Sequence, residues 1–204
     1  MKLYDATPAP NPRRVRVFLA EKGISVPMVQ VDMSKGEHKS PEFMKKNTSG
    51  KIPVLELDNG TCIAESISIC RYFEALQPEP NLFGRHAVEL GVIDMRNRQL
   101  EFEMLGPIGV SWRNGPIVSR LFKREGNQAA KAESDAAARA FYSRLNNELA
   151  DAQFIAGDRY TVADITGMVV IDFATKLVEL QPAAELTHLW RWHASVSARP
   201  SAAA

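Results

Sequence analysis

Two short segments carry the residues best suited to bind a ligand, Ile52-Pro53 and Glu65-Ser66. Residues 52–55 have the composition of a strand, and because proline cannot donate to a sheet ladder, it belongs at the first position of a strand or at an edge. The backbone groups of Ile52 are therefore left available to a ligand. Glu65 and Ser66 open a helix, and the free N–H groups of a helix N-terminus favour a carboxylate. The sequence predicts that both segments face one binding cleft.

The elements around these residues alternate between strand and helix signals. Asn11 is predicted as the N-cap of the first helix, with Pro12 at its first position, where proline is well tolerated. Asn59-Gly60 is predicted to close a tight hairpin with a primed turn. The helix that begins at Ser66 is predicted to carry Ile67, Cys70 and Phe73 or Glu74 along one face. The expected order is βαβαββα, with strands at 3–4, at 28–32 and in a hairpin over 53–63, and with helices over 13–21, 40–47 and 66–76.

A proline-punctuated polar segment, residues 77–81, separates these elements from a second half in which helical periodicity takes over. Within that half, Thr161 and Asp164 have the spacing of a capping box, which predicts the start of a buried central helix. A last helix is expected over 186–197. The assignment is therefore an α/β domain over 1–77, a linker over 78–85 and an all-helical domain over 86–204.

The overall composition favours a globular protein with small-molecule partners. The 25 basic and 24 acidic residues leave a formal net charge of +1, so nothing in the charge balance indicates nucleic acid or an anionic membrane as a partner. The two cysteines, Cys62 and Cys70, are too few for a disulfide framework, which favours a reducing compartment, and we expect the cytoplasm. No leader sequence and no apolar segment of about 18 residues is found, so export and membrane insertion are not expected.

Together these features resemble the glutathione S-transferase family, and the resemblance extends over almost the whole chain. The segments 12–16, 36–39 and 52–58 are similar to those of the fungal-type class of the family, which also occurs in bacteria. The resemblance implies a thioredoxin-like N-terminal domain that binds glutathione as cosubstrate, a helical domain that shapes the pocket for a small hydrophobic electrophile, and no metal. It also implies a cis peptide bond before Pro53, a role in detoxification and a homodimer, for which Arg71 and Arg96 or Arg98 are candidate contacts.

By the same resemblance, the two segments described first hold glutathione. Ile52, next to Pro53, is expected to pair its backbone with the cysteinyl part. The Glu65 carboxylate would take the γ-glutamyl ammonium, and Ser66 would take the α-carboxylate. These residue types suit the task independently, because a zwitterionic head group needs one anion and a set of donors. The candidates for the glycine carboxylate are His38, Lys39 and Lys51.

The chain departs from many classes of this family at the group that activates the glutathione thiol. Alignment on residues 14–16 puts Ala9 or Pro10 where those classes have Ser or Cys, and neither can activate a thiol. A thiolate is favoured by hydrogen-bond donors and by a positive helix end, and the helix beginning at Asn11 supplies that dipole. We expect the donor to be Thr7, Asn11 or an ordered water.

The electrophile is expected between the first strand–helix loop and a mostly apolar part of the helical domain. Ser111 and Asn114 could also help to hold a catalytic water. Two other functions stay open because the usual Tyr, Ser or Cys is missing: a non-catalytic interaction module of the same fold, and a glutathione-dependent disulfide reductase or isomerase. The candidate pocket residues are Pro10, Ile108, Ser111, Trp112 and Asn114.

Overall fold

The structure, a computed structural model, describes all residues from 1 to 204. The chain divides into a first unit, Met1–Leu82 with Pro200–Ala204, and a second unit, Phe83–Arg199. The last residues, expected in the helical domain, thus complete the first unit as a short 3-10 helix, η4 (Pro200–Ala203). The guanidinium of Arg13 donates to the Ala202 carbonyl over 2.9 Å. This contact ties the end of the chain to the first helix.

The first unit is built on a four-stranded mixed sheet with the order β2-β1-β3-β4. Strands β1 and β2 are parallel, and β3 is antiparallel to β1 and to β4. The predicted βαβαββα order is confirmed. The elements are β1 (Lys2–Asp5), α1 (Pro10–Lys22), β2 (Met28–Gln30), the 3-10 helix η1 (Glu37–Lys39), α2 (Pro41–Lys46), β3 (Val54–Glu56), β4 (Cys62–Ala64) and α3 (Ser66–Leu76).

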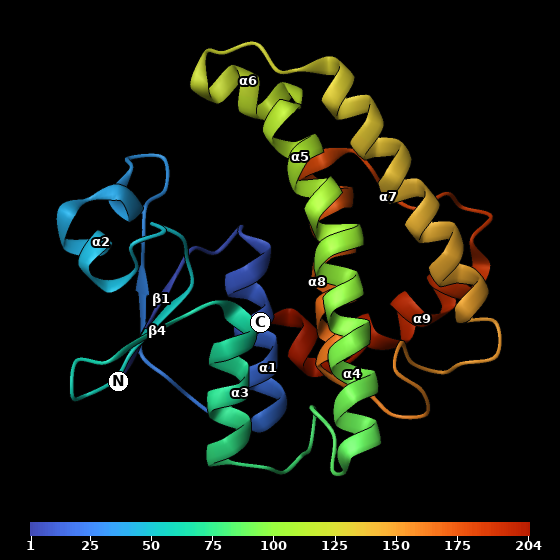
Figure 1. Ribbon diagram of the computed structural model, residues 1–204, viewed down its shortest axis with the longest axis horizontal. Coiled ribbons are helices and arrows are strands. Elements are labelled where there is room, and N and C mark those ends of the chain that lie inside the picture. Colours follow the sequence, from blue (N-terminus) through green and yellow to red (C-terminus); the bar gives the residue numbers. More distant parts are fainter. The chain divides into compact units, whose positions relative to one another are not determined.

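Helices α1 and α3 lie side by side on one face of this sheet, and α2 lies on the opposite side (Figure 1). On the α2 side, the Phe43 ring packs edge-on against Tyr4 of β1 at 5.7 Å. On the α3 side, Cys70 and Phe73 are buried along one face, as predicted. Ile69 is buried with them, whereas Ile67, predicted on the same face, is only half-buried.

Helix α1 begins earlier than the sequence predicts. Its N-cap is Ala9 and its first residue is Pro10, so the prediction of Asn11 as N-cap is wrong. The physical reason is that Pro10 and Pro12 both hold φ near the helical value, so a helix can start at the first of them. Gly23 ends the helix in the left-handed conformation, with φ 65°, as expected.

The hairpin between β3 and β4 has a three-residue loop instead of the predicted primed turn. The Leu57 N–H donates to the Thr61 carbonyl over 2.8 Å, and the Gly60 N–H donates to the Leu57 carbonyl over 3.0 Å. Gly60 has φ 84°, whereas Asn59 does not have a positive φ. A turn followed by a left-handed glycine is the usual three-residue solution for hairpins.

The second unit is all-helical, as predicted. In Figure 1, α5 and α7 run alongside each other within it. Two π-helical segments interrupt the regular helices. The elements are α4 (Ala87–Gln99), π-helix η2 (Leu100–Leu105), α5 (Gly106–Asn114), α6 (Pro116–Phe122), α7 (Gln128–Glu148), α8 (Val162–Phe173), π-helix η3 (Ala174–Val178) and α9 (Thr187–Ser197).

Helix α8 forms the centre of the second unit, and each of its residues from 162 to 171 is buried. The predicted capping box is present: the Asp164 carboxylate accepts from the Thr161 N–H over 2.9 Å. The same carboxylate accepts from the Ile155 N–H over 2.9 Å and from the Trp192 indole over 2.8 Å. Burial raises the pKa of Asp164, while these hydrogen bonds act in the opposite direction. One buried carboxyl thus joins a loop, α8 and α9.

None of the helices has both the length and the apolar character needed to cross a membrane.

Candidate functional site

The β3–β4 ladder sets the two predicted binding segments beside each other. Val54 pairs with Ala64 in this antiparallel ladder. The ladder ends at this pair, with Pro53 directly before β3 and Glu65 directly after β4. The peptide bond between Ile52 and Pro53 is cis, as the family resemblance implies. The sequence thus brings its two most informative segments to one corner of the sheet.

Glu65 occupies a strained backbone conformation at this corner. Its φ is 67° and its ψ is 119°, outside the regions that residues with a side chain ordinarily adopt. Such a conformation costs about 1–3 kcal/mol and is found mainly at functional sites. The side chain is exposed. The backbone at the N-terminus of α3 therefore holds this carboxylate outward.

Ser66 is buried and accepts a hydrogen bond from Arg14 of α1. The Arg14 Nη1 donates to the Ser66 hydroxyl over 2.8 Å, and Arg14 itself is only 1% exposed. Sequence reasoning did not assign Arg14 any role. A charged residue between apolar helix positions is a weak signal, and its partner lies on an element more than fifty residues away. Arg14 is therefore a buried partner of Ser66 that the structure adds to this corner.

The three candidates for the glycine carboxylate flank one turn. Gly50 has φ 56°, and a Cβ there would lie 2.7 Å from the Lys39 Nζ and 2.9 Å from the His38 carbonyl. Only glycine allows this close approach, and Lys39 also donates to the Ser49 carbonyl over 3.1 Å. Helix η1 therefore packs against the turn that leads directly into Lys51, which brings the three side chains to one region.

These three candidates differ in charge, in burial and in hydrogen bonding. Burial, followed by the nearby Lys39 charge, lowers the pKa of His38, so its ring is neutral at pH 7. Its Nδ1 is buried and has no hydrogen-bond partner. Lys51 is exposed. Lys39 and Lys51 are thus the two cationic candidates among the three, and His38 can offer only a neutral hydrogen bond.

Thr7 lies in a hydrogen-bonded network that fixes the loop between β1 and α1. Asp5, which is 1% exposed, accepts from Arg16 and from the Gln30 amide, each over 2.5 Å. Gln30 in turn accepts from the Thr7 hydroxyl over 3.0 Å and from the Thr7 N–H over 3.2 Å. The one hydroxyl proton of Thr7 is therefore used on Gln30. The expectation that Thr7 donates to the glutathione thiol is not supported by this geometry.

The tip of α1 offers a single free backbone donor, that of Asn11. Pro10 and Pro12 have no N–H, and the Arg13 N–H already donates to the Ala9 carbonyl over 3.3 Å. Asn11 is half-buried, and its N–H and carboxamide make no hydrogen bond within the chain. As the second residue of the helix, it lies where the helix dipole is most positive.

Comparison with known proteins decides the family. Residues 1–75 match the family model described as glutathione S-transferase, N-terminal domain. Residues 110–200 match the model described as glutathione S-transferase, C-terminal domain. The chain belongs to the glutathione S-transferase family. The fold and the enzymatic class expected from the sequence are thereby confirmed, and glutathione is the cosubstrate that this family uses.

Individual relatives agree with this assignment. Glutathione S-transferase 2 of Saccharomyces cerevisiae is 39% identical over 208 residues, which cover 98% of this chain and 87% of that protein. The crystal structure of Gtt2 from the same yeast has a TM-score of 0.92 at 38% identity and covers 98% of both chains. A Gtt2-class transferase of Vibrio parahaemolyticus has a TM-score of 0.86 at 33% identity, over 98% of this chain and 94% of that one.

The candidate electrophile residues of this transferase fall into two groups. Pro10 and Trp112 are half-buried, and the Trp112 ring packs edge-on against Phe173 at 5.5 Å. Ile108 and Ser111, by contrast, are fully buried within the second unit, and the Ser111 hydroxyl has no hydrogen-bond partner. Ile108 is thus a core residue and does not form an open pocket wall.

Asn114 has a structural task at the end of α5. Its Nδ2 donates to the Val110 carbonyl over 3.0 Å, and its Oδ1 accepts from the Asn127 N–H over 2.9 Å. These two hydrogen bonds join α5 to the start of α7. One N–H and one oxygen lone pair of the amide remain unused, so a water could still be held there only in the orientation that these two bonds impose.

Proposed function

We propose that this glutathione transferase adds the thiolate of bound glutathione to small hydrophobic electrophiles, by substitution or addition, in a detoxifying role. The observation that carries the proposal is the β3–β4 ladder, whose end at the Val54–Ala64 pair brings Ile52-Pro53 and Glu65-Ser66 to the same corner of the sheet. An extended tripeptide can pair its cysteinyl backbone with Ile52, just before the start of β3, as in strand addition. Its head group then lies at the start of α3.

The two charged ends of glutathione each meet suitable groups in this pose. At the start of α3, the Glu65 carboxylate faces the ammonium, and the Ser66 hydroxyl donates to the α-carboxylate. At the other end, Lys39 and Lys51 supply positive charge for the glycine carboxylate. These exposed ion pairs are each worth up to about 1 kcal/mol, so they orient the tripeptide more than they bind it.

The thiol then meets the N-terminus of α1. The free N–H and carboxamide of Asn11, together with the helix dipole, favour the thiolate over the thiol. A cysteine-like thiol has a pKa near 8.5, and lowering it by one unit takes only about 1.4 kcal/mol. No metal is required for this chemistry. Because the reacting sulfur belongs to the cosubstrate, the protein contributes orientation and charge stabilisation.

The test combines binding with turnover. Glutathione binding is measured by calorimetry, and conjugation is followed with a panel of aromatic halides and enones. Glu65→Gln is expected to weaken glutathione binding, whereas Glu42→Gln, at an exposed glutamate of α2 in the same unit, is expected to leave it unchanged. Absence of binding at millimolar glutathione would refute the proposal. Binding without conjugation of any electrophile would favour an interaction module, and preferential turnover of a glutathionylated disulfide would favour a reductase.

The homodimer proposal rests on the surface of α4 and η2. Apolar side chains recur there at spacings of four, three and seven residues, which places them on one side of the helical stretch, and all are exposed. A second copy of the chain would bury them. Of the candidate arginines, Arg96 pairs with Glu148 over 2.9 Å, whereas the Arg98 guanidinium lies 4.6 Å from the Phe102 ring centroid on this surface. The apolar residues are Val88, Val92, Met95 and Phe102.

Sedimentation of the protein checks the dimer. Met95→Glu would place a charge in the buried interface and is expected to shift the protein toward the monomer, whereas Glu133→Gln on α7 should not. A monomeric wild-type protein at micromolar concentration would refute the dimer.

A cytoplasmic location is part of the proposal. Cys62 and Cys70 are both free thiols, and Cys70 is fully buried. Free thiols persist in a reducing compartment. Fractionation of cells with an antibody to the chain tests the location.

A further inference from the structure

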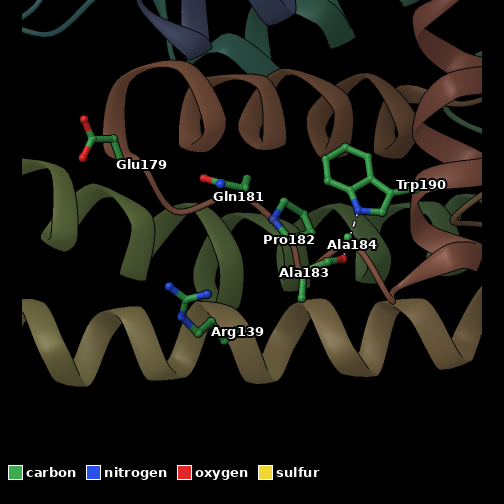
Figure 2. A pocket seen from close by; sticks show the side chains of 7 residues that line it. All are labelled: Arg139, Glu179, Gln181, Pro182, Ala183, Ala184 and Trp190. Carbon is green, nitrogen blue, oxygen red and sulfur yellow. Dashed lines mark hydrogen bonds between the residues drawn. The ribbon is translucent and has the colours of Figure 1, made fainter.

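The second unit contains a cavity that none of the proposed glutathione or electrophile residues lines. Its volume is about 370 Å³, within the range of small-molecule sites. It lies between α7, the segment that follows η3, and the start of α9 (Figure 2). The lining residues are Arg139, Glu179, Gln181, Pro182, Ala183, Ala184 and Trp190.

One end of this cavity is a fixed, flat apolar wall. The Trp190 indole N–H donates to the Ala183 carbonyl over 3.0 Å, so the ring is held in place and its only donor is used. Pro182, which is buried, continues the wall along the segment. An indole face and a proline ring without free polar atoms suit stacking against a planar ring.

The polar groups around the cavity are not engaged with the rest of the protein. The Arg139 guanidinium and the Gln181 amide make no hydrogen bond or ion pair within the chain. The backbone N–H groups of Gln181, Ala183 and Ala184 also have no partner, because this segment belongs to no helix or strand. A guanidinium and several N–H donors without acceptors together favour an anionic group.

Glu179 supplies the opposite charge at the far end. Figure 2 shows Trp190 and Glu179 at opposite ends of the row, with Gln181 and Pro182 between them and Arg139 reaching toward the row from α7. Glu179 stands in the left-handed conformation, with φ 59°, which fixes the direction of its backbone. A second anionic group near Glu179 would be repelled by its carboxylate, so these residues favour a ligand with a single negative charge.

We propose that this cavity binds a small monoanionic aromatic carboxylate. The planar ring stacks on Trp190 and Pro182, and the carboxylate accepts hydrogen bonds from Arg139 and from the free N–H groups of the 181–184 segment. The site is separate from the corner proposed for glutathione, so one protein molecule can hold both ligands at once. Its occupancy does not depend on the function proposed above.

The experiment titrates 2-naphthoate into the full-length protein by calorimetry, with and without saturating S-hexylglutathione. Arg139→Gln is expected to weaken naphthoate binding about fivefold, the effect of losing one exposed charge interaction. Glu179→Gln is expected to tighten binding, because it removes the repelling charge. Arg120→Gln, at an exposed arginine of α6, is the matched control and should leave the affinity unchanged.

The uncharged isostere 2-naphthylmethanol should bind the wild-type protein as weakly as naphthoate binds the Arg139→Gln variant. The inference is overturned if naphthoate does not bind, if S-hexylglutathione displaces it, or if Arg139→Gln and Arg120→Gln weaken it equally. Because the Arg139 guanidinium makes no hydrogen bond or ion pair within the chain, its variant should unfold at the wild-type temperature, so a loss of affinity cannot come from a loss of fold. A failure of S-hexylglutathione to bind would count against the proposed function alone.

Discussion

The guanidinium of Arg14 donates a 2.8 Å hydrogen bond to the hydroxyl of Ser66, and the two residues are 1% and 5% exposed. Arginine can only donate, so the serine oxygen is the acceptor and the hydroxyl proton must point elsewhere. The pair therefore joins α1 to α3 and leaves the one donor of Ser66 unused by Arg14. In the glutathione pose proposed above, Arg14 is a positioning residue for Ser66.

Replacement of Ser66 by alanine should therefore affect both binding and folding. Loss of a hydrogen bond to a carboxylate is expected to weaken glutathione binding about tenfold or more. The free energy of unfolding should fall by about 1–3 kcal/mol, because a buried guanidinium donor loses its acceptor. Calorimetry and urea denaturation measure the two effects. Ser68→Ala, at an exposed serine of the same helix, is the control, and equal effects of both variants would contradict the role of Ser66.

Replacement of Glu65 by glycine should separate stability from function. Glycine adopts a φ of 67° without strain, so the free energy of unfolding is expected to be unchanged or higher by up to about 2 kcal/mol. Glutathione binding should nevertheless fall, because the carboxylate that meets the ammonium is gone. Glu65→Gln keeps the strain and removes only the charge, so it should lose affinity without gaining stability. If the glycine variant binds glutathione as the wild type does, the carboxylate has no role in binding.

The sequence predicted the local parts of this site and missed the parts that depend on distant contacts. Proline directly before β3 and the Glu65-Ser66 pair at the start of α3 are local signals, and the β3–β4 ladder ends between them at the Val54–Ala64 pair. The contact of Arg14 with Ser66 joins elements that only the tertiary fold brings together. Helix α1 is predicted too short because only Pro12 is taken as a start signal, although Pro10 is equally compatible with helical φ.

A pH dependence is expected from the cluster at Glu56 of β3. Hydrogen bonds from Lys46 and then from Tyr4, both 2.7 Å long, lower the pKa of Glu56 from 4.5 to about 2. Because the folded pKa is the lower one, this carboxylate stabilises the fold fully above pH 4.5, and the contribution is lost as the pH falls toward 2.

Urea denaturation across that pH range checks the linkage. Glu56→Gln should flatten the decline in the free energy of unfolding between pH 4.5 and 2, the window set by the two pKa values of Glu56. Glu125→Gln, at an exposed glutamate of the second unit, should leave the slope unchanged. A Glu56→Gln variant with the wild-type slope would show that the hydrogen bonds from Lys46 and Tyr4 do not hold the carboxylate in solution.

Replacement of Asn11 by aspartate should raise the pKa of the bound glutathione thiol while stabilising the protein. A carboxylate at the second residue of α1 interacts favourably with the helix dipole, by about 0.3–1 kcal/mol. The same negative charge opposes a nearby thiolate and removes a neutral donor, so the thiol pKa should rise by about one unit or more. Stability and thiol activation would thus change in opposite directions, which a general loss of folding cannot produce.

Thiolate absorbance as a function of pH measures this pKa on the glutathione complex. Asn11→Ala removes the carboxamide and keeps the backbone N–H, so its thiol pKa should lie between those of the wild type and Asn11→Asp. Thr7→Val should leave the pKa near the wild-type value, because the Thr7 hydroxyl proton is already donated to Gln30 over 3.0 Å. If Thr7→Val raises the pKa as much as Asn11→Asp does, the donor lies in the β1–α1 loop and the tip of α1 does not activate the thiol.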